Sequence, residues 1–243
     1  MKPTKSIIVV GVQRSGTSLL CEALKATGQA GVPEEYFLQL ADVEWRREKS
    51  EDDFRAYVAH LLDVGTTPNG VFGANIMWNT HSGVWPVLQR LSEFSAATPG
   101  EVYDKVLPGV HYVWVRRRDH VRQAVSWVKA AQTGIYRTDY DNAREPLQEP
   151  EFDFKFIDSL RGLIVEGEAG WGGHFKSSGH PPAEVFYEDL VASFHDTISR
   201  VLEFCGLSVS GRHEGGALPV KKLADGINDE WVARYNEMRI DAP

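Results

Sequence analysis

The chain has 243 residues, of which 42% are hydrophobic and 25% are charged, and its formal net charge at pH 7 is −8. A chain of this length and apolar content can close one sizeable core, so we expect a single domain over residues 1–243. The acidic balance argues against a general nucleic-acid binder, which needs a basic face, and no apolar run approaches the length that a membrane span requires.

The first predicted elements are a strand and a helix joined by a short loop. An apolar run predicts the strand over about 6–12, and the helix runs from Thr17 to about residue 27, where Gly28 ends it. Because the strand begins so close to the first methionine, we expect no secretory signal and a cytoplasmic location.

The loop has the spacing of a phosphate-binding loop but lacks one residue. Gly11 and Gly16 keep the spacing of G-x-x-x-x-G-K-[ST], whereas Thr17 stands where that motif has its lysine. Backbone N–H groups of such a loop converge on an anion at the positive end of the helix. The side chains that add donors are Arg14, Ser15, Thr17 and Ser18. A triphosphate would also need the lysine and an acidic metal site, which we do not find, so the loop predicts a shorter anion with no metal.

Hydrophobic spacing predicts further helices and strands in alternation along the chain. They are helices over about 51–64, 84–94, 119–133, 190–205 and 229–239, and strands over about 70–77, 110–115 and 183–187. This alternation predicts an α/β fold with a mostly parallel sheet covered by helices on both faces. Segments 134–150 and 207–222 show little periodicity, and they are either substrate-facing loops or plain connections.

The densest basic cluster directly follows the strand at 110–115. Arg116, Arg117 and Arg118 come first, and Arg122 follows on the next helix. In open parallel sheets, ligands bind at the carboxyl ends of the strands, so the cluster is a candidate anion site. The alternative is a solvated helix start, because three adjacent arginines cannot all face one ligand.

Several motifs together resemble the bacterial trehalose 2-sulfotransferase family. In chain order they lie at 12–20, 24–28, 33–37, 67–73 with 77–79, Arg117-x-Asp119 with 123–127 and 131–133, Gly170-Trp171, and 229–235. The resemblance covers nearly the whole chain. It implies a P-loop-containing three-layer sulfotransferase fold and transfer of a sulfuryl group from 3′-phosphoadenosine-5′-phosphosulfate (PAPS) to a sugar hydroxyl. The product of the donor is then 3′,5′-adenosine bisphosphate (PAP).

The resemblance also implies the residues that hold the donor. By this resemblance, its 5′-phosphosulfate is bound by Arg14, Ser15, Gly16, Thr17 and Ser18. Its 3′-phosphate is bound by an arginine and a serine on the next ligand-binding segment. The spacing in the trehalose family selects Arg117 with Ser126, whereas the spacing in most sulfotransferases would select Arg118.

Two residues are candidates for the chemical step. Negative charge grows on the leaving group during an in-line transfer, and Arg14 is placed to stabilise it. The acceptor hydroxyl needs a general base, and Glu35 aligns with the base proposed for the family. Glu34 is its near neighbour, and a first-turn helix position is the plain structural reading of both. The other candidate bases are His81, His111 and His120.

The chain departs from the family pattern at two positions. Val32 stands where the family has Glu before the proline, and Asn75 stands where it has Lys before the Met-Trp pair. The first change makes trehalose itself a doubtful acceptor, and the second removes a cation near the reacting sulfate. The tryptophans that could stack on a sugar or adenine, or belong to the core, are Trp78, Trp127 and Trp171.

The sequence therefore predicts a PAPS-dependent sulfotransferase acting on a small-molecule hydroxyl, in a carbohydrate or a glycosylated natural product. The resemblance also implies a homodimer. Two alternatives stay open: a P-loop kinase or other nucleotide-binding protein, and a catalytically degenerate sulfotransferase scaffold.

Overall fold

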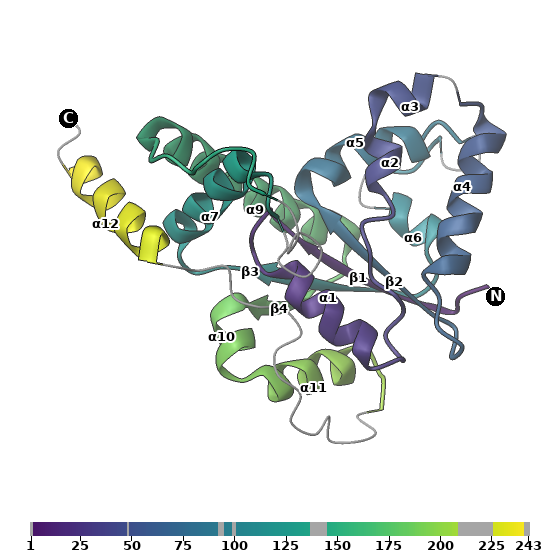
Figure 1. Ribbon diagram of the computed structural model, residues 1–243. Helices are drawn as coiled ribbons and strands as arrows, with labels where there is room; N and C mark the ends of the chain where they lie inside the picture. The colour runs from purple at the N-terminus through teal and green to yellow at the C-terminus, as the bar shows by residue number, and fades with distance from the viewer. Residues whose placement is uncertain are drawn as a thin grey trace.

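The computed structural model describes residues 2–47, 49–91, 95–98, 101–136, 145–208 and 226–240. A sheet of four strands in the order β2-β1-β3-β4 lies at its centre (Figure 1). The strands are β1 (Lys5–Gly11), β2 (Val71–Met77), β3 (Val110–Arg116) and β4 (Ala183–Phe186). All three neighbouring pairs are parallel.

Helices cover both faces of this sheet. The helices of the described residues are α1 (Thr17–Ala26), α2 (Leu38–Ala41), α3 (Val43–Arg47), α4 (Glu51–Val64), α5 (Trp78–Leu88), α6 (Val102–Val106), α7 (His120–Thr133), α9 (Phe154–Ser178), α10 (Tyr187–Ala192), α11 (Phe194–Phe204) and α12 (Gly226–Ile240). Helices α1, α10 and α11 lie on one face, and α5, α6 and α9 lie on the other (Figure 1). The predicted α/β fold with a parallel sheet is confirmed.

β1 is the central strand, and it explains the position of the predicted loop. Ile7 and Val9 pack toward α1, whereas Ile8 and Val10 pack toward the opposite helices, so both faces of the strand are buried. That burial is the reason for its unbroken apolar run. β2 and β3 pair on opposite sides of β1. The loop after Gly11 therefore opens at the topological switch point of the sheet, where ligands bind in such folds.

Two predicted helices have different bounds in the structure. The helix predicted over 84–94 begins earlier, directly after β2, and α5 already ends at Leu88. The single helix predicted over 190–205 is two helices, α10 and α11, because Ser193 leaves helical dihedrals at φ −136° and ψ 57°. The break lets Leu190 and Ile198 both reach the core beneath α1.

The two segments of low periodicity fall largely outside the described residues. Residues 145–150 are described and form neither helix nor strand, whereas 137–144 are not described. In the second segment, residues 209–222 are likewise not described.

Helix α9 was not predicted, and its glycines are the reason. Its 25 residues include Gly162, Gly167, Gly170, Gly172 and Gly173, a composition that argues against a helix. A Cβ on Gly170 would lie 2.1 Å from Cζ2 of Trp78, and one on Gly167 would lie 2.7 Å from Cγ2 of Val12. Two of these glycines therefore let α9 approach Trp78 and the carboxyl end of β1.

This packing predicts opposite effects on stability for two alanine substitutions in α9. Gly170→Ala is expected to lower the free energy of unfolding by about 1–3 kcal/mol, because its methyl group must displace Trp78. Gly173→Ala has no atom within 4 Å of the new Cβ and is expected to raise it by about 0.5–1 kcal/mol through helix propensity. Urea denaturation followed by circular dichroism measures both. Shifts of the same sign would contradict this account.

Candidate functional site

The loop between β1 and α1 is a tight turn that leaves backbone donors for a ligand. Arg14 has φ 67° and Gly16 has φ 102°, so two left-handed residues stand close together. The N–H of Ser15 donates to the Val12 carbonyl at 3.1 Å. The N–H groups of Thr17 and Ser18 donate to no described backbone group. Amides in this arrangement, at the N-terminus of a helix, form an anion-binding concavity.

Both loop glycines are required by close contacts. A Cβ on Gly11 would lie 2.7 Å from Oγ of Ser15 and 2.9 Å from the Val115 carbonyl oxygen. A Cβ on Gly16 would lie 2.5 Å from Cδ2 of Tyr187, which begins α10. Tyr187 was not among the predicted site residues, although its place at the end of the last predicted strand puts it at the ligand edge of the sheet.

The adjacent arginines after β3 point in three different directions. Arg116 donates to Glu168 of α9 at 2.6 Å, and Arg118 forms a two-bond pair with Asp189 at 2.7 and 2.9 Å. Arg117 alone turns to the loop, where its Nη1 donates to the Arg14 carbonyl at 3.4 Å. Its guanidinium lies 4.4 Å from the centre of the Tyr187 ring. The structure thus brings Arg117, and not Arg118, to the loop.

Arg14 joins the same group of side chains. Its Nε donates to Oγ of Ser126 at 3.1 Å, and its Nη1 donates to the Tyr136 carbonyl at 2.5 Å. Burial, followed by the neighbouring Arg117, lowers the pKa of Arg14 to about 10, and burial lowers the pKa of Arg117. Both groups stay cationic at neutral pH. Neither forms an ion pair with a described carboxylate.

The loop and these two arginines fit an anionic group. Ser15 Oγ and Arg117 Nε are buried without a hydrogen-bond partner among the described residues. Thr17 is buried as well, and Ser18 is half-buried. The donor set consists of N–H, hydroxyl and guanidinium groups, which suit phosphate or sulfate. No group of three described His, Cys, Asp or Glu side chains is placed to hold a metal ion.

Glu35 comes from a different segment, beside β2. Glu34 bridges Ala74, and its carbonyl accepts the N–H of Asn75 at 2.8 Å, so this segment runs along the edge strand. The Glu34 carboxylate forms an ion pair with Lys25 of α1. Glu35 is exposed and lines an open cleft of about 500 Å³, which we call the α2 cleft. Its lining residues are Glu34, Glu35, Tyr36, Leu38, Gln39, Asp42 and Tyr57.

The two departures from the family pattern are part of the same edge. Asn75 is 4% exposed, and its Oδ1 has no hydrogen-bond partner in the described part of the chain. The Val32 N–H donates to the Gly65 carbonyl at 2.9 Å, and its carbonyl accepts the Tyr36 hydroxyl at 2.8 Å. At Val32 only the backbone contacts are polar, so its side chain offers no hydrogen bond to a sugar.

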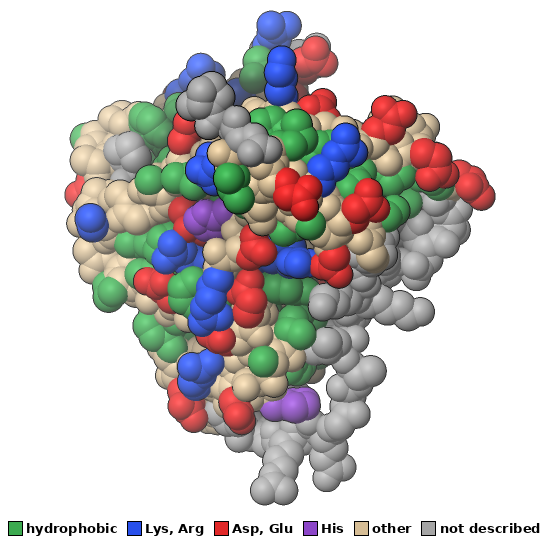
Figure 2. Space-filling model, turned by 90° about the vertical axis from the view of Figure 1, so that its left-hand side faces the viewer, with side chains coloured by type: hydrophobic (Ala, Val, Ile, Leu, Met, Phe, Trp, Pro, Cys, Tyr) green, Lys and Arg blue, Asp and Glu red, His purple; other side chains and the backbone are tan. Residues whose placement is uncertain are grey.

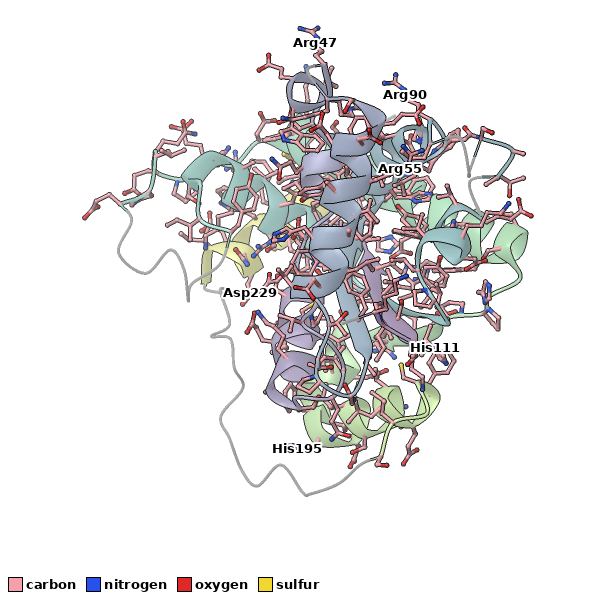
Figure 3. The ribbon with its side chains drawn as sticks, turned by 90° about the vertical axis from the view of Figure 1, so that its right-hand side faces the viewer. Arg47, Arg55, Arg90, His111, His195 and Asp229 are labelled. Carbon is pink, nitrogen blue, oxygen red and sulfur yellow. The ribbon has the colours of Figure 1, made fainter. Side chains whose placement is uncertain are left out.

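The histidines considered as bases do not line the α2 cleft. His81 is buried, with its ring 4.9 Å from that of Trp171. His111 pairs with Ile7 near the amino ends of the strands and lies close to α11 (Figure 3). His120 lies 3.4 Å from the Glu168 carboxylate. Each of these side chains therefore has a structural environment away from the cleft.

His81 and His174 predict a loss of stability in acid. Burial, and then the neighbouring His174, lowers the pKa of His81 to about 3. Burial, and then the neighbouring His180, lowers the pKa of His174 to about 4. An unfolded histidine titrates near 6.5, so below about pH 6.5 the unfolded chain binds protons that the folded chain refuses. The free energy of unfolding should fall by up to about 1.4 kcal/mol per histidine for each pH unit below that value.

Urea denaturation between about pH 5 and 7 measures this slope. His174→Phe removes one titrating ring, and neither nitrogen of His174 has a described partner to lose. In the variant, the free energy of unfolding should change less steeply with pH, by up to the contribution of one proton, which is about 1.4 kcal/mol per pH unit. An unchanged slope would mean that His174 is not the group that titrates.

The face of the molecule in Figure 2 shows how charge is distributed there. Basic and acidic side chains are interspersed on it and do not gather by sign. A general nucleic-acid binder would show a continuous basic patch.

The chain is similar to known proteins over nearly its whole length. Residues 6–238 match the family described as Stf0 sulphotransferase. The chain is 28% identical to the trehalose 2-sulfotransferase of Mycobacterium tuberculosis (strain ATCC 35801 / TMC 107 / Erdman), over 100% of this chain and 97% of the relative. It is 29% identical to the trehalose 2-sulfotransferase of Mycolicibacterium smegmatis, over 94% and 93%.

Two solved structures are similar at low identity. The sulfotransferase domain of the Synechococcus PCC 7002 olefin synthase is 15% identical with a TM-score of 0.41, and covers 100% of this chain and 97% of its own. Retinol dehydratase in complex with androsterone and the inactive cofactor PAP is 18% identical with a TM-score of 0.39, over 98% and 64%.

Proposed function

Because the chain belongs to the Stf0 sulphotransferase family, we propose that it transfers a sulfuryl group from PAPS to a sugar hydroxyl, with Glu35 as general base. The family and the enzyme class predicted from the sequence are confirmed. The observation that carries the donor assignment is the pair of half-buried guanidinium groups, Arg14 and Arg117, neither of which forms an ion pair with a described carboxylate.

The loop and the two arginines bind different parts of the proposed donor. The amides of 16–18, with Arg14, bind the 5′-phosphosulfate, and Arg117 with Ser126 binds the 3′-phosphate. The donor supplies the sulfuryl group and leaves as PAP. Arg14 stabilises the charge that grows on the leaving group, and as a permanent cation it binds oxygen without giving up a proton.

The α2 cleft is the proposed acceptor site. Glu35 is exposed on this cleft, and we assign it as the carboxylate that takes the proton of the acceptor hydroxyl. Tyr36 and Tyr57 offer flat apolar surface, and Gln39 offers an amide, a combination that suits a polyhydroxylated ring. The relatives are named as trehalose sulfotransferases. Because Val32 offers no hydrogen bond to a sugar, we propose a carbohydrate or glycosylated acceptor other than trehalose.

Isothermal titration calorimetry with PAP, compared with ATP and magnesium, tests the donor. We expect saturable binding of PAP and transfer of sulfur-35 from labelled PAPS to a carbohydrate acceptor. A preference for ATP would favour the P-loop kinase alternative, which Thr17 opposes by standing in place of the lysine. Binding without transfer to any acceptor would favour the degenerate scaffold.

Adjacent arginines give a matched test of the donor site. Arg117→Ala should raise the dissociation constant for PAP by about 10- to 100-fold, because a charged hydrogen-bond donor is lost. Arg118→Ala removes the same group from an exposed pair with Asp189 and should leave PAP affinity unchanged. Calorimetry measures both variants. Equal losses would mean that the effect is general electrostatics and not a contact.

Three sequence predictions stay predictions: the single domain over 1–243, the homodimer and the cytoplasmic location. None of the described helices is long and apolar enough to span a bilayer.

A further inference from the structure

Trp171 of α9 holds the first glycine of the donor loop. Its side chain is fully buried, and its indole N–H donates to the Gly11 carbonyl at 3.0 Å. A side chain with no exposed surface cannot stack on a bound sugar or on adenine. The Gly170-Trp171 motif therefore needs another explanation.

The bond from Trp171 belongs to a set that covers every loop carbonyl from Gly11 to Arg14. Trp171 donates to Gly11 at 3.0 Å, Ser15 N to Val12 at 3.1 Å, Gln123 to Gln13 at 2.8 Å and Arg117 to Arg14 at 3.4 Å. Carbonyl oxygens carry partial negative charge and would repel an anion. When each of these oxygens is held in a hydrogen bond within the protein, the N–H groups of Thr17 and Ser18 are left for the anion.

Trp171 is well placed to fix the loop before a ligand arrives. Its ring lies 4.9 Å from that of His81, 5.5 Å from that of Trp78 and 5.9 Å from that of Phe175. This packing leaves the indole no room to turn. Gly170 makes space for Trp78 beside it, so the two residues of the motif act together.

We propose that Trp171 is a positioning residue for the donor site. Its hydrogen bond fixes the Gly11 carbonyl and so preorganises the loop for the phosphosulfate of PAPS. The inference rests on the proposed donor. It predicts that loss of the indole N–H weakens donor binding although Trp171 does not touch the donor, because the loop must then pay the ordering cost on binding.

Trp171→Phe tests this, because phenylalanine keeps an aromatic ring and removes the N–H. The dissociation constant for PAP should rise about tenfold, as expected for one lost hydrogen bond. KM for PAPS should rise by a similar factor, while kcat at saturating donor changes little. A merely structural role would lower thermal stability and leave both constants of the folded enzyme unchanged.

Trp114→Phe is the matched control. Trp114 is buried in the same core cluster, but its indole N–H has no acceptor among the described residues. The two substitutions remove the same atoms, and only one removes a bond to the loop. We expect Trp114→Phe to bind PAP like the unsubstituted protein. Equal PAP affinity in all three proteins would overturn the proposal, as would equal weakening in both variants.

The unsubstituted protein gives a second test, which holds even if Trp171→Phe does not fold. In protein labelled with ¹⁵N-tryptophan, the Trp171 indole proton should be protected from exchange before PAP is added and should stay so afterwards. Protection that arises only with PAP would overturn preorganisation. Failure of the unsubstituted protein to bind PAP would instead contradict the proposed donor.

Discussion

Glu35→Gln is expected to lower kcat by about 100- to 10,000-fold and to leave PAP affinity unchanged. The amide keeps the size of the side chain but cannot accept the proton that the acceptor hydroxyl loses. Because Glu35 is exposed on the cleft, the change should cost no stability. Transfer of sulfur-35 at saturating PAPS measures kcat, and calorimetry measures the binding of PAP.

Glu34→Gln is the control for that substitution. It makes the same chemical change one residue earlier, where the carboxylate pairs with Lys25 on α1. The loss of a partly exposed ion pair should shift stability by less than about 1 kcal/mol and leave most of the turnover. If Glu34→Gln abolishes transfer and Glu35→Gln does not, the assignment of the base is wrong.

Arg14→Ala is expected to lower kcat by about 100- to 1,000-fold, the usual effect of removing one preorganised donor from a developing charge. PAP should also bind more weakly, because a charged hydrogen-bond donor is lost from the loop. Arginine and alanine both have a Cβ, so the positive φ of 67° at this position should cost alanine no more than it costs arginine. Single-turnover measurements with pre-bound PAPS separate the loss of rate from the loss of binding.

Arg14→Lys sharpens this test. Lysine keeps the charge but loses the fork that lets one side chain reach both Ser126 and the Tyr136 carbonyl. We expect activity between those of the unsubstituted enzyme and Arg14→Ala. Full activity in Arg14→Ala would remove the proposed role in stabilising the leaving group.

The donor loop shows how much of the site the sequence could predict. Gly11, Gly16 and the hydroxyl residues Ser15, Thr17 and Ser18 lie within one short segment, and their spacing is typical of one kind of turn. No distant contact is needed to recognise such a turn. The missing lysine at Thr17 then predicts a shorter anion with no metal. The fold class followed in the same way from alternating strands and helices.

The arginines show where the sequence alone was insufficient. Arg116, Arg117 and Arg118 are equivalent as sequence, and the spacing of related enzymes allowed two of them. Pairing of β3 with β4 and the position of Tyr187 direct Arg117 to the loop, while Asp189 holds Arg118 elsewhere. The direction of each side chain depends on elements that come about 70 residues later, such as Asp189, which is 71 residues from Arg118.

Helix α9 shows the same limit for the fold. Its glycines argue against a helix when propensity is summed along the chain, because glycine loses backbone entropy without gaining side-chain contacts. In the structure Gly170 faces Trp78 and Gly167 faces Val12, and a side chain would not fit at either position. Tertiary packing overrides the local preference.

The sequence by itself determined the strand order in the chain, the anion loop and the family, because each rests on neighbouring residues or on motifs kept in order. Only the tertiary structure decided which arginine meets the loop, that Glu34 pairs with Lys25, and that Trp171 binds Gly11 from 160 residues away. A hydrogen bond depends on the distance and angle between two groups. For groups far apart in the chain, those are set by how strands pair and helices pack.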